Sequence, residues 1–170
     1  SDCNLNSGDN SSPTNRCVIT VAAGASFNWF EVNIDGIVTA DRGILFVGNA
    51  FNVIRDSKIK NVTSYGINFH KSANSNLVNN LIVGNATSGN GAGIYIDSAT
   101  AGLESDYNSI NNLTVMNSGS AVYLFRGARL STLSRILSVN NNYGIRGTSN
   151  SVHVDSNTSD HLTIMNSGTD

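Results

Sequence analysis

The side chains best suited to chemistry in this sequence recur at regular distances along the chain. They belong to four similar segments: GINFH from Gly66, GIYID from Gly93, AVYLF from Ala121 and GIRGT from Gly144. Two positions of these segments carry polar and aromatic residues, the first Asn68, Tyr95, Tyr123 and Arg146, the second His70, Asp97, Phe125 and Thr148. An imidazole beside a carboxylate can transfer protons, while aromatic rings and guanidinium groups can stack on a ligand and bind its anionic groups.

Alternation along these segments predicts that they are strands. Successive side chains of a strand point to opposite faces, so the apolar positions between the polar ones face a core: Ile67, Phe69, Ile94, Ile96, Val122 and Leu124. If the strands stack in parallel, adjacent copies lie about 5 Å apart. His70, Asp97, Tyr95 and Tyr123 then share one patch, with Arg126 at its rim. The alternative is that aromatic residues simply stack in columns and that Asp97 forms an ordinary surface pair with His70.

An internal repeat supports such a stack. The segment LTVMNSGS at Leu113 to Ser120 returns as LTIMNSGT at Leu162 to Thr169. Self-similarity at a short, fixed period indicates a solenoid in which each repeat forms one coil. A second strand in each coil has apolar or small inward residues at matching positions: Ile54, Ser57 and Ile59, then Val78, Leu81 and Val83, then Ile110, Leu113 and Val115.

Pairs of asparagines nine residues apart bracket this second strand. The pairs are Asn52 with Asn61, Asn76 with Asn85, Asn108 with Asn117, and Asn157 with Asn166, while one copy has Thr132 facing Asn141. Stacked amide side chains can hydrogen-bond to their own copies above and below, and Asn satisfies backbone groups in turns. We therefore predict two structural ladders of asparagine side chains at the corners of the coil.

This repeat pattern resembles the right-handed parallel β-helix proteins, the pectate-lyase-like superfold. The resemblance implies an all-β solenoid of about six coils, with a single domain over residues 18–170. Composition agrees, because glutamate occurs only at Glu31 and Glu104 and lysine only at Lys58, Lys60 and Lys71, so good helix formers for a solvated surface are scarce.

The distances between second-ladder residues change at one coil. They run from 61 to 85, 85 to 117, 117 to 141 and 141 to 166, so one coil is eight residues longer than its neighbours. The additional residues fall in 86–92 and 98–106, on both sides of GIYID. Insertions in solenoids gather on the binding face, although a tolerant surface can also accept them. We expect these two insertions to form walls around the patch.

The ends of the sequence suggest further features. Cys3 and Cys17 predict a disulfide that closes a polar segment at 1–17, which favours a secreted or cell-surface location; two free thiols are the alternative. Phe27, Trp29 and Phe30 are interpreted as a cap over the first coil, and stacking on a sugar is the alternative use of Trp29.

The last repeat stops before its next strand, so we expect an incomplete C-terminal coil, as in a fragment of a longer helix or one that self-associates.

Several classes of partner are disfavoured. The formal net charge is -2 without a Lys/Arg cluster, so no nucleic acid partner is expected, and no apolar run approaches the ~20 residues of a membrane span. No ligand cluster suggests a metal site. Three of four Asn-x-Ser/Thr sequons fall on ladder positions, and we interpret them as products of the repeat, which favours a bacterial or phage source.

Two classes of function follow. The first is an exported surface module, an adhesin segment or structural part of a larger protein, that binds a polysaccharide or cell-surface glycan. The second, implied by the resemblance, is a polysaccharide lyase or glycoside hydrolase acting on an acidic polysaccharide, with calcium as a cofactor if it is a lyase. The sequence lacks the aspartate clusters and the Gly-His-Gly and Arg-Ile-Lys signatures of such enzymes. The catalytic candidates are Asp97 and His70, and the ligand-binding candidates are Asn68, Tyr95, Tyr123, Phe125, Arg126 and Arg146.

Overall fold

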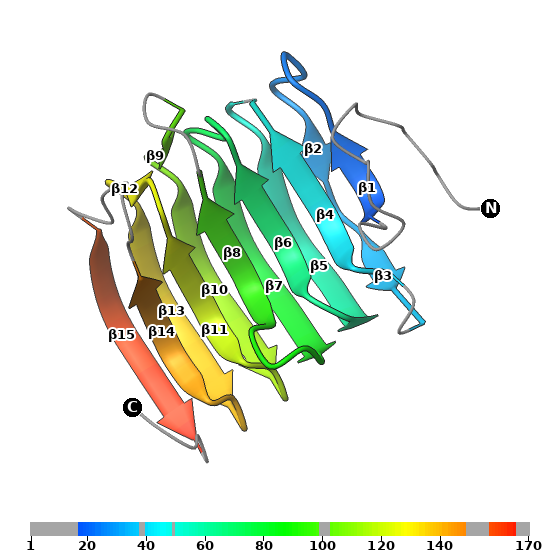
Figure 1. Cartoon of the computed structure of the whole chain (residues 1–170), viewed down its shortest axis with the longest axis vertical. Coiled ribbons are helices and arrows are strands. Elements are labelled where there is room, and N and C mark those ends of the chain that lie inside the picture. The colour runs from blue at the N-terminus through cyan, green and yellow to red at the C-terminus, as the bar shows by residue number, and fades with distance from the viewer. Residues whose placement is uncertain (1–16, 38–39, 49, 99–102, 149–156, 166–170) are drawn as a thin grey trace.

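The computed structural model describes residues 17–37, 40–48, 50–98, 103–148 and 157–165. These residues form strands and turns without a helix. Two long parallel sheets run the length of the molecule, and the chain passes from one sheet to the other and back in each coil (Figure 1). This is a parallel β-helix of about five turns, so the predicted all-β solenoid is confirmed, with slightly fewer coils than expected.

Each sheet is assembled from strands that are not consecutive in sequence. Sheet A contains, in spatial order, β1 (Cys17–Val21), β4 (Arg42–Val47), β6 (Tyr65–His70), β8 (Ala92–Asp97), β11 (Ser120–Phe125) and β14 (Tyr143–Thr148). Sheet B contains β15 (Thr158–Met165), β13 (Thr132–Val139), β10 (Ser109–Met116), β7 (Leu77–Ala86) and β5 (Val53–Val62), with β2 (Trp29–Phe30) and β3 (Asn33–Asp35) both paired to β5. A short third sheet joins β9 (Ser105–Asp106) to β12 (Ala128–Arg129).

The core lies between the two sheets and follows the predicted alternation. The inward residues of β6, β8 and β11 and those of β5, β7 and β10 are at most 6% exposed. The polar inward position of β5, Ser57, is satisfied locally: its Oγ accepts a hydrogen bond from the Val32 N–H at 3.0 Å and donates to the Arg55 carbonyl at 2.6 Å. A hydroxyl is therefore accommodated in an apolar core without an unpaired group.

The first predicted asparagine ladder is present and extends by one residue, to Asn28. The Oδ1 atom of Asn76 accepts from both the backbone N–H and the Nδ2 of Asn52, at 3.0 and 2.9 Å. Asn108 Oδ1 accepts from the same two groups of Asn76 at 3.1 and 3.0 Å. Where Thr132 was expected, Ser131 occupies the ladder position, and its N–H donates to Asn157 Oδ1 at 2.9 Å. Thr132 instead begins β13.

The second ladder is also present, but its assignment at Asn141 is wrong by one residue. Nδ2 of Asn85, Asn117 and Asn140 donates to the Oδ1 of the residue one coil earlier at 2.9, 3.2 and 3.3 Å respectively, starting from Asn61. All four have positive φ, between 52° and 59°, a conformation that Asn tolerates better than most residues.

Asn141 itself is buried beside the second ladder. Its Oδ1 accepts from the Ser118 N–H at 2.8 Å, and its Nδ2 donates to Ser138 Oγ at 2.8 Å. The coil that ends here is one residue shorter than the repeat predicts, which moves the ladder back to Asn140. Asn166 lies outside the described residues.

A third column of turn residues was missed by the sequence reasoning. Asp56, Asn80 and Asn112 have φ of 47°, 55° and 56°, and Asn80 Nδ2 donates to Asp56 Oδ1 at 2.7 Å. These residues bend β5, β7 and β10 in the middle. The signal was available, because the inward positions Ile54 and Ser57 are three residues apart, whereas a regular strand has a period of two.

The expectations for the ends have different outcomes. Cys17 is half-buried at the start of β1 and has no disulfide partner among the described residues; as a thiol, its pKa is raised by burial. Cys3 lies outside the described residues, so the disulfide stays a prediction. The prediction of an aromatic cap is wrong for Phe27 and Trp29, which are 80% and 59% exposed. Phe30 packs against the core residue Phe46 in a T-shaped arrangement, with 5.7 Å between the ring centroids. Residues 166–170 of the last repeat also lie outside the described part.

Candidate functional site

The two columns predicted on the outer side of sheet A are aligned in the structure. Asn68 pairs with Tyr95, Tyr95 with Tyr123, and Tyr123 with Arg146 across β6, β8, β11 and β14. In the second column His70 pairs with Asp97, and Phe125 pairs with Thr148. Parallel pairing in register therefore brings together residues that are 23 to 28 positions apart in the sequence.

Four aromatic rings form a continuous cluster on this surface. Tyr95 lies at its centre: its ring centroid is 4.2 Å from that of Tyr65, 5.1 Å from that of Tyr123 and 5.9 Å from that of Phe125. Tyr65 and Tyr95 are nearly parallel, with an angle of 11° between their planes. Sequence reasoning missed Tyr65, because it reaches Tyr95 diagonally from a different position of its strand.

Three guanidinium groups lie on these rings. The Arg146 guanidinium lies 4.7 Å from the Tyr123 ring centroid, Arg126 lies 4.7 Å from Phe125, and Arg42 lies 5.8 Å from Tyr65. Together with the four rings they make up what we term the aromatic face: Tyr65, Tyr95, Tyr123, Phe125, Arg42, Arg126 and Arg146. Cation–π contacts of this kind keep an arginine oriented. The Nε atoms of Arg42 and Arg126 are buried, and Arg42 also pairs with Asp41 at 3.4 Å.

One insertion contributes to the aromatic face. Asn90, in the 86–92 insertion, accepts a hydrogen bond from an Arg146 Nη at 3.0 Å through its Oδ1. This contact spans two coils and fixes the guanidinium above β11. This insertion therefore contacts the aromatic face through Asn90. In the second insertion, 98–106, residues 99–102 lie outside the described part.

A carboxylate network lies beside the rings. Asp97 is 8% exposed, and its Oδ1 is 2.9 Å from His70 Nδ1 and accepts a hydrogen bond from Asn68 Nδ2 at 3.0 Å. Asn68 is only 2% exposed and also donates to the Tyr95 carbonyl at 3.3 Å. Asn68 was expected to touch a ligand, and the structure instead places it below the surface, where it orients Asp97.

Burial and charge set the protonation of the central phenols. Burial, reinforced by the Asp97 carboxylate, strongly raises the pKa of Tyr95. Burial also raises the pKa of Tyr65, against the opposing effect of the Arg42 guanidinium. Both phenols therefore remain protonated, and thus able to donate, throughout the physiological pH range.

The arrangement combines the groups needed for proton transfer next to an anion. If Nδ1 of His70 donates to Asp97, then Nε2 is the acceptor nitrogen of the neutral imidazole. The protonated Tyr95 hydroxyl can donate, and the guanidinium groups can pair with a carboxylate. Among the described residues, no three His, Cys, Asp or Glu side chains lie close enough together to hold a metal ion.

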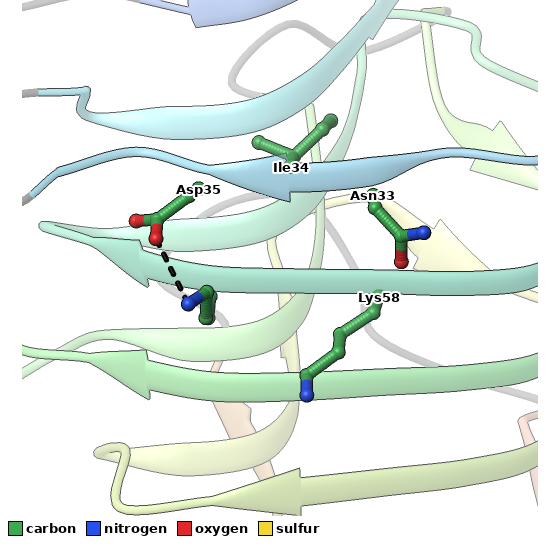
Figure 2. Close-up of a pocket in the computed structure, with 5 residues that line it drawn as sticks. Asn33, Ile34, Asp35 and Lys58 are labelled. Carbon is green, nitrogen blue, oxygen red and sulfur yellow. Dashed lines mark ion pairs between the residues drawn. The ribbon is translucent and has the colours of Figure 1, made fainter.

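A separate pocket lies on sheet B, far from these residues in the coil. It has a volume of about 310 Å³ and is lined by Asn33, Ile34, Asp35, Lys58 and Lys60 of β3 and β5 (Figure 2). Asp35 forms an ion pair with Lys60 at 2.9 Å. Hydrogen bonds from Lys60, Asn61 and the Ile37 N–H lower the pKa of Asp35 to about 2. Nothing in the sequence indicated this pocket, whose lining has neither aromatic residues nor a second carboxylate.

Comparisons with known proteins bear on the fold. A family model described as right handed beta helix region matches residues 3–159. The crystal structure of an alginate lyase from Paenibacillus sp. str. FPU-7 superposes with a TM-score of 0.65 at 14% identity. The match covers 87% of this chain and 54% of that one, so this chain spans about half the length of the lyase. At this identity the likeness shows the fold alone. No curated protein matches the sequence.

The described residues also include no helix with the length and apolar character needed to cross a membrane.

Proposed function

The chain belongs to the family of right-handed β-helix proteins, and from this premise we propose that its aromatic face binds a linear acidic polysaccharide. The observation that carries the proposal is the gathering of four rings and three guanidinium groups on one side of sheet A. A family fold hosts many functions, so the chemistry of this surface has to identify the ligand.

The rings suit a sugar polymer. Aromatic faces stack on the C–H faces of pyranose rings. Tyr123 is only 8% exposed, so the rings that a sugar can reach are those of Tyr65, Tyr95 and Phe125. The columns extend over β6, β8, β11 and β14, which spans roughly 15 Å at the usual strand separation. This length accommodates several consecutive sugar units. Because Tyr65 and Tyr95 are held by mutual stacking, little side-chain entropy is lost on binding.

The guanidinium groups favour an acidic polymer. Arginine binds carboxylates with two parallel hydrogen bonds, and a charge-assisted pair is about twice as strong as a neutral one. Arg126 is notable, since its Nε is buried and has no hydrogen-bond partner among the described residues. A ligand carboxylate at the rim of the face would accept hydrogen bonds from the exposed nitrogens of the Arg126 and Arg146 guanidinium groups.

Titration calorimetry with alginate and polygalacturonate tests the proposal, with hydroxyethylcellulose as the neutral comparison. We expect Tyr95→Ala and Arg146→Ala to weaken binding of an acidic polymer at least about fivefold, which corresponds to 1 kcal/mol. Arg55→Ala is the matched control, because Arg55 is an exposed arginine over a ring, Trp29, on sheet B. Unchanged affinity in both Tyr95→Ala and Arg146→Ala would refute the proposed face.

A second candidate function is a lyase acting on the same class of polymer. The observation that favours it is the His70–Asp97 pair at 2.9 Å beside the protonated Tyr95. In β-elimination, a base such as His70 Nε2 removes the proton next to the uronate carboxyl group. The C4–O bond then breaks, a C4=C5 double bond forms, and a donor such as Tyr95 protonates the leaving oxygen. Atoms balance without water or an oxidant.

Formation of the unsaturated product can be followed by its ultraviolet absorbance, with and without calcium. The lyase hypothesis predicts that His70→Ala and Tyr95→Phe abolish the absorbance increase while binding is retained. Binding without any turnover, with or without calcium, supports the non-catalytic surface module instead. Under either function we propose that the protein acts outside the cytoplasm, as a secreted or cell-surface protein, because polysaccharides of this kind are found there.

A further inference from the structure

Three side chains hold the guanidinium group of Arg146. It lies 4.7 Å from the ring centroid of Tyr123 and 5.2 Å from that of Tyr143, and its Nη1 donates a hydrogen bond to Asn90 Oδ1 at 3.0 Å. Contact with a ring limits where a guanidinium lies but leaves its N–H groups free to turn, whereas a hydrogen bond fixes their direction. Asn90 therefore determines where the remaining N–H groups of Arg146 point.

The turn that carries Asn90 is itself held in place by the backbone. Within the turn, the Gly91 N–H donates to the Ser88 carbonyl at 2.8 Å, and the Gly91 carbonyl accepts from the Ser120 N–H of the next coil at 2.8 Å. Gly119 allows this close approach, because a Cβ atom there would lie 2.6 Å from the Gly91 carbonyl oxygen. The insertion is thus packed against the following coil, and Asn90 extends from a fixed backbone.

The partner of Arg146 is an uncharged amide, so the positive charge is not cancelled. Arg146 has no carboxylate partner among the described residues. Arg42, at the opposite end of the aromatic face, pairs with Asp41 at 3.4 Å, which offsets its charge. An amide that accepts a hydrogen bond orients a guanidinium and leaves its charge available to an anion, whereas a carboxylate would orient it and neutralise it.

We infer that Asn90 is a specificity-determining residue, which makes the aromatic face select a uronate carboxylate over an uncharged sugar by orienting Arg146. The inference rests on the proposed function, since it concerns the same polymer and the same face. An arginine that is already oriented loses less side-chain freedom on binding, and its planar fork binds a carboxylate with two parallel hydrogen bonds. Asn90 is a positioning residue: it acts through Arg146 and needs no contact with the polymer.

The ratio of the affinities for alginate and for carboxyl-reduced alginate, measured by titration calorimetry, tests this role. We expect Asn90→Ala to lower the ratio about two- to tenfold, the range to which the cost of ordering one long side chain on binding converts. In an Arg146→Ala background the same substitution should have no effect, because Asn90 acts through Arg146. Asn33→Ala is the matched control, since Asn33 is an exposed asparagine on β3 of sheet B, and it should leave both affinities unchanged.

The outcomes separate this inference from the proposed function. A ratio that falls in Arg146→Ala but not in Asn90→Ala would overturn the inference and leave the proposed function standing. Equal affinity of the wild type for the two polymers would overturn both. An effect of Asn90→Ala that persists in the Arg146→Ala background, or that is the same for both polymers, would show that Asn90 does not act through the charge of Arg146, and the inference would be wrong.

Discussion

Replacing Asn76 by Ala tests how the first asparagine ladder stabilises the coil. Asn76 is 1% exposed, and its Oδ1 is the acceptor for two groups of Asn52, the backbone N–H and Nδ2. Alanine removes this acceptor from both donors, which are buried because Asn52 is itself 0% exposed. Asn108 loses one of its two donors and keeps the backbone N–H.

The expected loss follows from the two buried hydrogen bonds to Asn76 Oδ1 that the substitution removes. Each such bond contributes about 0.5 to 1.5 kcal/mol, so Asn76→Ala should lower the free energy of unfolding by about 1 to 3 kcal/mol. Asn117→Gly is the control in the second ladder. Asn117 is exposed and has φ of 53°, which glycine adopts freely, so water replaces its hydrogen bonds and the loss should be about 1 kcal/mol or less.

Urea denaturation followed by circular dichroism measures both variants against the wild type. An Asn76→Ala protein within about 0.5 kcal/mol of the wild type, the usual range for a neutral surface substitution, would contradict the reasoning. Equal losses in Asn76→Ala and Asn117→Gly would also contradict it, since burial would then have no influence on the strength of the two ladders.

Three other predictions concern packing and protonation. Gly93→Ala should destabilise the protein by about 1 to 3 kcal/mol in the same denaturation assay, because the added Cβ would clash with the Val115 side chain. Gly84→Ala is the matched control and should be neutral, because its Cβ would meet only Lys60 Cβ, at 4.0 Å. By NMR, Asp35 should titrate with a pKa of about 2, and this pKa should move toward 3.8 in Lys60→Met. Because folding lowers the pKa of Asp35, the stability that this carboxylate contributes is present above about pH 4 and is lost as the pH falls through 2. Burial raises the pKa of Tyr95, so Tyr95→Phe should leave the tyrosinate absorbance at pH 10 unchanged.

The sequence was sufficient for the coil and its core. Alternation at Ile67 and Phe69, repeated at Ile94 and Ile96, determined which face is inward, and these residues are fully buried. The ladder at Asn52 and its copies could be found because a buried amide requires the same partner in every coil. These features depend on a repeated environment, which a single sequence reveals through its period.

The errors arose where the structure departs from a strict period. Three consecutive asparagines, Asn140 to Asn142, made the ladder register ambiguous, and a coil one residue short decided it in favour of Asn140. The Tyr65–Tyr95 stack depends on the direction of two side chains, which strand spacing does not determine. Burial of Asn68 was likewise invisible, because an outward position is expected to be solvated until neighbouring side chains cover it.

The preference of the protein for alginate over carboxyl-reduced alginate tests the central claim most directly. The two polymers present similar ring faces and differ in charge, so their ratio of affinities isolates the contribution of the guanidinium groups on the aromatic face. We predict that the wild type prefers alginate at least about tenfold, or 1.4 kcal/mol, and that Arg146→Ala lowers this ratio. Equal affinity of the wild type for the two polymers would contradict the account.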